Sequence, residues 1–160
     1  MRSSGGVKPP ESKSLVAGAE PNRSAAWSKR PDWTPKGLCL VATPIGNASD
    51  ISLRALRALE AADVVACEDT RVTGKLLALH GIRASLTAYH EHNAARARPN
   101  LIRRLKNGES VTLVSDAGTP LVSDPGYQLV RACIDENIPI TAVPGASAVL
   151  TALQLSGLPS

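Results

Sequence analysis

The sequence VTLVSDAGTPLVSDPGY, Val111 to Tyr127, contains the junctions that decide the fold. It opens with an apolar, β-branched run, Val111 to Ser115, which is typical of a buried strand. Glycine and small residues then form a loop. Asp124 and Pro125 indicate a helix start, because aspartate accepts hydrogen bonds from the first free amides and proline fits the first helical position. The stretch therefore predicts a strand, a loop and a helix in succession.

The same alternation extends in both directions from this stretch. Short apolar runs predict four more strands, at Leu38 to Ala42, Val64 to Cys67, Leu86 to Tyr89 and Ile138 to Val143. Strands separated by helices favour parallel pairing. The sequence thus predicts an α/β protein with an open, mostly parallel five-stranded sheet and helices on both faces.

Between the predicted strands, apolar residues recur every three or four positions, as on the buried side of a helix. We expect Asp50 to cap the first helix and the second to end at Gly81. A third covers Ala94 to Lys106, and the last follows Pro144 and Gly145. The residues that define the first two helices are Leu53, Leu56, Leu59, Leu76, Leu77 and His80.

Charge and composition divide the chain at Gly37. Residues 1–36 contain 7 Lys and Arg against 3 Asp and Glu, whereas residues 37–160 contain 11 of each sign. The first 36 residues also hold five prolines, six serines and both tryptophans. Lacking helical or strand periodicity, they cannot bury enough surface to offset the entropy of ordering. We expect a disordered basic tail at 1–36 and a folded domain at 37–160.

We expect no export signal in this sequence. The longest apolar run of the tail, Leu15 to Ala19, is too short for a signal-peptide core, and no segment reaches the length of a membrane span. A transit peptide is a weaker alternative, because prolines disfavour an amphipathic targeting helix. Cys39, Cys67 and Cys133 lie in apolar segments, as reduced thiols of a cytoplasmic protein do. We therefore expect a soluble, cytoplasmic protein that is not bound to a membrane.

Three loops that follow predicted strands are rich in glycine, proline and small hydroxyl residues. They are Thr43 to Asn47 (TPIGN), Ser115 to Pro120 (SDAGTP) and Pro144 to Ala148 (PGASA). Ligands of an open parallel sheet bind outside the carboxyl ends of its strands, so these loops are the candidate ligand site. TPIGN is not the Gly-x-Gly-x-x-Gly pattern, which argues against a nicotinamide or flavin cofactor. Taken singly, an ordinary turn explains each loop at least as well: a steric need for Gly46, an Asx-turn at Asp116, a helix cap at Ser147.

Five stretches of the chain carry a resemblance to a known family. They are Val41 to Asn47 (VATPIGN), Ala66 to Arg71 (ACEDTR), Tyr89 to Asn93 (YHEHN), Leu113 to Tyr127 (LVSDAGTPLVSDPGY) and Val143 to Ala152 (VPGASAVLTA). Together they resemble the tetrapyrrole-methylase-like superfamily, and within it the methyltransferases that modify a cytidine 2′-hydroxyl of small-subunit ribosomal RNA. The resemblance covers Gly37 to Ser160 almost without a gap.

The resemblance implies an enzyme of two α/β domains, usually a homodimer, with S-adenosylmethionine held in the cleft between the domains. Residues 37–160 would supply only the first, cofactor-binding domain, so we expect this domain alone to bind the cofactor weakly or not at all and to be inactive. The cofactor contacts carried over by motif position are Pro44, Ile45, Gly46, Asp116, Ala117, Gly118, Thr119, Ser147 and Ala148.

Charged residues and histidines follow the second and third predicted strands, on the edge that carries the loops. A ribose hydroxyl is a poor nucleophile, so its methylation needs a base or hydrogen-bond acceptor as well as in-line positioning. The candidate catalytic residues are Glu68, Arg71, His90 and Glu91. His90 or Glu91 would accept the hydroxyl proton, and Arg71 would hold a phosphate. A network that only fixes the loops is the alternative, and it is favoured for Asp69 and His92.

Five positive charges occur within eleven residues of the third predicted helix, at Arg96, Arg98, Arg103, Arg104 and Lys106. A solvated helix face is the usual explanation for such a run. With ribosomal RNA as the substrate, a surface that follows RNA phosphates becomes about equally plausible. The chain has two tyrosines and no phenylalanine, so we expect no aromatic platform for RNA bases.

Three other interpretations compete with RNA methylation. A zinc site of His90, His92 and a cysteine is disfavoured, because no further ligand pair has metal-site spacing; we expect no metal. A C-methyltransferase for a tetrapyrrole precursor is the alternative enzyme, but such relatives carry a more glycine-rich first loop and a Gly-Asp-Pro second loop. A non-catalytic module that binds RNA or a partner through its sheet edge and basic helix is the alternative outside catalysis.

Overall fold

The computed structural model describes residues 34–121 and 126–159. The chain divides into two units, residues 1–32 and residues 33–160, and the architecture below is that of the second unit. Two expectations fall outside the described residues. These are the disorder of the tail up to residue 33 and the helix start at Asp124 and Pro125.

Five strands form one parallel sheet in the order β3-β2-β4-β1-β5. The strands are β1 (Leu38–Val41), β2 (Val64–Cys67), β3 (Leu86–Ala88), β4 (Val111–Val114) and β5 (Ile140–Val143). Leu38 of β1 is paired with Val111 of β4 on one side and with Ile140 of β5 on the other. All four strand pairings are parallel, and the predicted fold class is confirmed.

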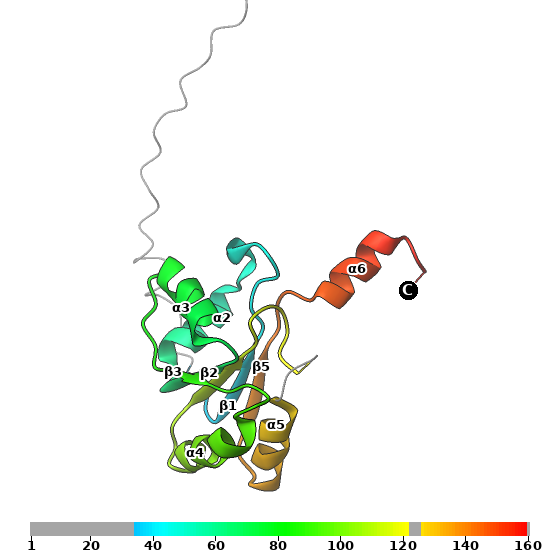
Figure 1. Ribbon diagram of the computed structural model, residues 1–160. Helices are drawn as coiled ribbons and strands as arrows, with labels where there is room; N and C mark the ends of the chain where they lie inside the picture. Colours follow the sequence, from blue (N-terminus) through cyan, green and yellow to red (C-terminus); the bar gives the residue numbers. More distant parts are fainter. Residues whose placement is uncertain (1–33, 122–125, 160) are drawn as a thin grey trace, which may run out of the picture. The chain divides into compact units, whose positions relative to one another are not determined.

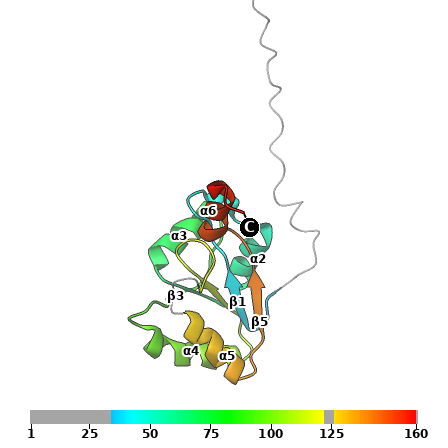
Figure 2. The same cartoon turned by 90° about the vertical axis from the view of Figure 1, so that its right-hand side faces the viewer.

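Helices cover both faces of this sheet, as Figures 1 and 2 show. On one face lie α2 (Leu53–Ala61) and α3 (Thr70–Leu79), and on the other lie α4 (Ala94–Lys106) and α5 (Gly126–Asp135). A short 3-10 helix, η1 (Ala48–Asp50), precedes α2. The last helix, α6 (Ala148–Ser156), projects from the end of β5.

Side chains alternate along each strand between two apolar cores, because successive residues of a strand point to opposite faces. Leu38 of β1 belongs to the core under α4 and α5, whereas its neighbour Cys39 belongs to the core under α2 and α3. The three cysteines are free and buried as expected. Burial raises the pKa of Cys39 and Cys133 to about 11, and it also raises the pKa of Cys67.

The start of α2 differs from its prediction. Ser52 caps the helix in place of Asp50, because the Ser52 hydroxyl oxygen accepts a hydrogen bond from Ala55 N at 3.1 Å. Asp50 belongs instead to η1, a turn that the apolar pattern does not reveal. Leu53 therefore lies in the first turn of α2 and is 45% exposed, while Ala55 and Leu59 are buried.

The other predicted helix ends agree with the structure. His80 is the cap residue of α3, and Gly81 after it adopts a φ of +70°. The bounds of α4 are as expected, and Ser147 caps α6 by accepting from Leu150 N at 3.4 Å. None of the residues of α6 is buried. Within the described residues, no helix is both long enough and apolar enough to cross a membrane.

Candidate functional site

The three glycine-containing loops meet above the carboxyl ends of β4, β1 and β5, which are neighbours in the sheet. Thr43 N donates to Gly118 O at 2.9 Å, and Gly118 N donates back to Thr43 O at 3.1 Å. The Thr43 hydroxyl also donates to Ser115 O at 3.1 Å. The third loop joins through the Thr119 hydroxyl, which donates to Ala146 O at 3.1 Å. The loops thus form one hydrogen-bonded layer.

Two glycines allow this layer to be close-packed. Gly118 has a φ of +78°, and a Cβ there would lie 3.2 Å from Cγ2 of Ile45. A Cβ at Gly145 would lie 2.9 Å from Cβ of Ala42. Gly46 is different: its φ of +103° needs glycine, yet a Cβ would meet no atom within 4 Å. The space beside Gly46 is therefore open.

This open space belongs to a pocket of about 170 Å³ between the loops after β1 and β4 and the helix α3. Its lining residues are Thr43, Pro44, Gly46, Ala48, Val72, Thr73, Leu76, Ser115 and Asp116. The strands β1 and β4 are adjacent, but the helices that follow them pack on opposite faces of the sheet. A crevice at such a topological switch point is the usual ligand site of an open α/β sheet.

The structure brings only some of the expected cofactor contacts to this pocket. Pro44, Gly46 and Asp116 line it. The others lie in the surrounding loops or at the start of α6: Ile45, Ala117, Gly118, Thr119, Ser147 and Ala148. The sequence did not predict that α3 lines the pocket, with Val72 and Leu76 among its lining residues. Their helical spacing indicates a packing face, but it does not indicate which loop that face meets.

Asp116 connects the β4 loop to the start of α3. One carboxylate oxygen accepts a hydrogen bond from Asp69 N at 3.0 Å. This oxygen does not form the Asx-turn that was the expected alternative, in which it would accept from its own loop. Among the described residues, the second oxygen accepts no hydrogen bond, and Asp116 is exposed. One face of this carboxylate is thus available to a hydroxyl or ammonium group of a ligand.

Asp69 and Arg71 form a tight local pair at the start of α3. Asp69 caps the helix by accepting from Arg71 N at 2.8 Å, and its carboxylate also binds Nε and Nη2 of Arg71, the latter at 2.6 Å. These hydrogen bonds from Arg71 lower the pKa of Asp69 to about 2. Asp69 thus fixes the start of α3 with Arg71 as its partner, and not a histidine; that its role is only structural stays a prediction. A phosphate would have to compete with Asp69 for this guanidinium.

The histidine-containing loop follows β3, beside the end of β2. Tyr89 N donates to Cys67 O at 2.7 Å, which extends the β2–β3 pairing by one residue. His90 N donates to Asn93 Oδ1 at 2.9 Å, so the turn is fixed locally. The ring centroids of His90 and His92 are 6.0 Å apart with the ring planes inclined at 65°, and Glu91 is exposed. Glu68 is half-buried in the adjacent loop after β2. All four candidate catalytic residues therefore lie at the carboxyl edge.

No group of three histidine, cysteine, aspartate or glutamate side chains is arranged to hold a metal ion, as far as the described residues extend.

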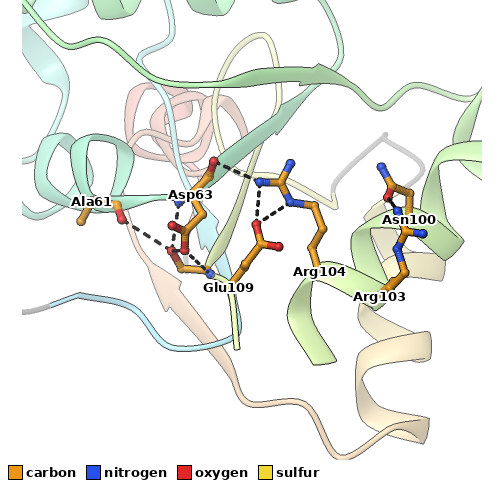
Figure 3. Close-up of polar contacts among 7 residues, drawn as sticks. Ala61, Asp63, Asn100, Arg103, Arg104 and Glu109 are labelled. Carbon is orange, nitrogen blue, oxygen red and sulfur yellow. Dashed lines mark hydrogen bonds and ion pairs between the residues drawn. The ribbon is translucent and has the colours of Figure 1, made fainter. Parts of the chain in front are cut away.

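The basic residues of α4 do not form one uniform surface. Figure 3 shows Arg104 paired with Glu109, at 2.6 Å, and reaching the carbonyl of Asp63, near the amino ends of β2 and β4. Arg103 donates to Asn100 Oδ1 at 2.7 Å in the same view. Lys106 pairs with Glu136 of α5 at 2.7 Å. The charges of Arg104 and Lys106 are thus offset by carboxylates.

The family profile described as Tetrapyrrole (Corrin/Porphyrin) Methylases matches residues 37–160. This chain belongs to the tetrapyrrole methylase family. Among solved structures of this fold, uroporphyrin-III-C-methyltransferase from Thermus thermophilus is 30% identical with a TM-score of 0.56, covering 76% of this chain and 52% of that one. A cobalt precorrin-4 methyltransferase, at 22% identity and a TM-score of 0.55 over 74% of this chain and 49% of that one, shares the fold.

Curated relatives of this family member are more similar in sequence. The protein named Ribosomal RNA small subunit methyltransferase I of Mesorhizobium japonicum is 64% identical over 123 residues, which cover 77% of this chain and 42% of the relative. The protein of the same name from Escherichia coli O157:H7 is 51% identical, over 77% of this chain and 43% of its own length. The chain thus spans less than half the length of these curated relatives.

Proposed function

We propose that this chain is the cofactor-binding domain of an S-adenosylmethionine-dependent methyltransferase that modifies a cytidine 2′-oxygen in small-subunit ribosomal RNA. The observation that carries the proposal is the pocket at the β1–β4 switch point, which two of the three small-residue loops help to line, within the segment that matches the tetrapyrrole methylase family. The RNA substrate is supported by relatives that are 64% and 51% identical and carry the name Ribosomal RNA small subunit methyltransferase I. Ribosomal RNA as the substrate also supports a cytoplasmic location.

The residues present fit such a cofactor. Pro44, Val72 and Leu76 offer apolar surface for a flat ring, and the backbone beside Gly46 is open to close approach. The available oxygen of Asp116 would accept from a hydroxyl or ammonium group. When bound, the cofactor supplies the methyl group as part of a sulfonium. With about 170 Å³, however, the pocket is smaller than the roughly 300 Å³ at which sites for ligands of this size begin.

A second half would therefore complete the site. We infer that this chain supplies the first of two domains and is inactive alone. Two observations support this: the chain spans 42% of the Mesorhizobium relative, and α6 is rich in leucine with none of its residues buried. A helix that is apolar on most sides is normally buried against other parts of a protein. A second domain, or the second subunit of the homodimer expected from the resemblance, would provide this cover.

At the same carboxyl edge of the sheet as the pocket, the residues after β2 and β3 would act on the RNA. We propose that His90 or Glu91 accepts the proton of the 2′-hydroxyl as the oxygen attacks, and that Arg71 positions a neighbouring phosphate. Glu68 would orient this group of side chains. None of these steps requires a metal ion.

Methylation of a tetrapyrrole precursor is the second candidate, because solved structures of this fold carry that activity in their names. A chimaera tests the two. Residues 1–160 are joined to the remaining part of the Mesorhizobium relative and incubated with methyl-labelled cofactor and small ribosomal subunits, naked ribosomal RNA or a tetrapyrrole precursor. We expect label in the RNA of the subunits and none from the 160-residue chain alone. Label in the tetrapyrrole only, or an inactive chimaera beside an active Mesorhizobium enzyme, would contradict the proposal.

A further inference from the structure

A second hollow lies on the opposite face of the sheet from α3. The helices α4 and α5 lie side by side there (Figure 1). Between them is a shallow surface depression of about 370 Å³, whose lining residues differ from those of the pocket described above. Its lining residues are Arg98 of α4 and Tyr127, Gln128, Arg131, Ala132 and Asp135 of α5. We call it the α4–α5 hollow.

The two guanidinium groups of this hollow keep most of their positive charge available. Arg98 donates to the side-chain oxygen of Gln128, a neutral acceptor that does not offset its charge. Arg131 is 3.6 Å from Asp135, and these side chains are 59% and 65% exposed. An exposed pair of this kind is weak and is screened by salt. The hollow thus differs from the other end of α4, where close ion pairs offset Arg104 and Lys106.

An exposed aromatic ring lies beside these arginines. Tyr89 is 1% exposed and belongs to the core, whereas Tyr127 is 63% exposed. The small number of tyrosines predicts no aromatic platform for RNA bases, and this stays a prediction; folding does place one of the two rings on the surface beside basic side chains. An exposed ring flanked by arginines is the usual combination for binding a single-stranded nucleic acid, because the ring stacks on a base while the cations bind the backbone.

The α4–α5 hollow lies toward the carboxyl edge of the sheet, the edge that carries the proposed reaction site. Both α4 and α5 begin at the carboxyl edge of the sheet, where β3 and β4 end. Arg98, Tyr127 and Arg131 all lie within the first two turns of their helices. His90 and Glu91 occupy the loop that leads into α4.

We propose that the α4–α5 hollow binds single-stranded RNA next to the methylated nucleotide, with Arg98 and Arg131 on one phosphodiester and Tyr127 stacked on the adjacent base. The proposal rests on the proposed function in taking RNA as the partner. The Asp135 carboxylate opposes an anion in the hollow, so its charge limits the affinity. Phosphate contact by arginines is salt-dependent, whereas base stacking is much less so.

Fluorescence anisotropy of the 160-residue chain with a fluorescein-labelled, 12-nucleotide single-stranded RNA tests this directly. In about 50 mM salt, we expect Arg98→Glu and Arg131→Glu each to weaken binding by about tenfold and to reduce the salt dependence. Tyr127→Ala should weaken binding by about fivefold without changing the salt dependence. Asp135→Asn should strengthen binding. The matched control is Arg83→Glu, the same charge reversal at an exposed position between α3 and β3, which should change binding less than twofold.

The proposal is overturned if Arg98→Glu and Arg131→Glu bind RNA like Arg83→Glu, or if the unmodified chain does not bind the RNA. Arg98→Gln and Arg131→Gln, which only remove charge, replace either reversal that fails to fold by circular dichroism. If poly-glutamate binds as tightly as the RNA and Tyr127→Ala has no effect, the hollow would be assigned to an acidic protein instead. If the hollow does not bind RNA but the chimaera methylates RNA, only the RNA-binding proposal is rejected, and the proposed function stands. RNA binding through the hollow without RNA methylation rejects the proposed function alone.

Discussion

Asp116, at the end of β4, accepts a hydrogen bond from the backbone nitrogen of Asp69 at the start of α3, over 3.0 Å. The two residues are 47 positions apart in the sequence, and their contact joins the pocket loop to the helix that forms the pocket wall. The Asp116 carboxylate thus has two roles: one oxygen holds the pocket wall in place, and the other is the proposed contact to the ligand.

Two substitutions at Asp116 separate these roles. Asp116→Asn keeps an oxygen that can accept from Asp69 N but removes the charge, so we expect it to lower cofactor affinity of the chimaera by about tenfold with little loss of stability. Asp116→Ala should lower affinity and also destabilise the domain by about 1 kcal/mol, the usual net value of a hydrogen bond. Titration calorimetry and urea unfolding measure the two effects. Equal cofactor affinity in Asp116→Asn and the unmodified protein would remove Asp116 from the cofactor site.

The ion pair of Asp69 predicts a pH dependence of stability. Its pKa is lowered from 3.8 to about 2 by hydrogen bonds from Arg71, so the ionised carboxylate stabilises the fold above about pH 4. This contribution is lost as the pH falls through about 2. The pKa of Asp63 is also lowered, by hydrogen bonds from Ser110, and acts in the same direction.

We therefore expect Asp69→Asn to make unfolding less dependent on pH between about 4 and 2 than it is in the unmodified chain. Thermal unfolding followed by circular dichroism across this range provides the measurement. Asp50→Asn is the control, because the Asp50 carboxylate forms no hydrogen bond or ion pair with the described residues. An identical pH profile for Asp69→Asn and Asp50→Asn would show that the Asp69–Arg71 pair adds nothing to stability.

Two glycines should respond in opposite ways to alanine. At Gly145 a Cβ would lie 2.9 Å from Cβ of Ala42, so Gly145→Ala should destabilise the domain by about 1 to 3 kcal/mol through overpacking. Gly74 lies inside α3, where a Cβ would be an ordinary 3.7 Å from Leu86. Gly74→Ala should therefore stabilise the domain by about 0.5 to 1 kcal/mol. Urea unfolding decides both signs, and a tolerated Gly145→Ala would mean that the third loop is not tightly packed on β1.

The proposed base is tested in the chimaera. His90→Ala and Glu91→Ala are compared with His92→Ala, whose ring lies in the same loop but is favoured as structural. The residue that accepts the proton should lose at least about a hundredfold in kcat when replaced. A rise in KM for ribosomal subunits with an unchanged kcat would instead assign that residue to RNA binding. Arg71→Lys provides the corresponding test of phosphate positioning and should raise KM, because lysine lacks the bidentate geometry.

Much of the fold could be predicted because its signals are local. The runs Val64 to Cys67 and Val111 to Ser115 match the observed strands within one residue, since an apolar, β-branched run suits a buried strand wherever it lies. Gly81 likewise ends α3 through its own backbone freedom. The error at the start of α2 arose because Asp50 and Ser52 are both good caps, and an intervening 3-10 turn decides between them.

Taken by itself, the sequence determined the α/β class, the strand positions to within two residues (the last strand begins at Ile140, not Ile138) and the three small-residue loops, because periodicity, capping and turn formation depend on neighbours along the chain. Only the tertiary structure decided that Asp116 meets Asp69, that Val72 and Leu76 line the pocket, that Glu109 offsets Arg104, and that Tyr127 is exposed while Tyr89 is buried. The physical reason is the strand order β3-β2-β4-β1-β5. It places distant segments side by side, and the free energy that selects this order comes from packing the whole sheet between its two helical layers.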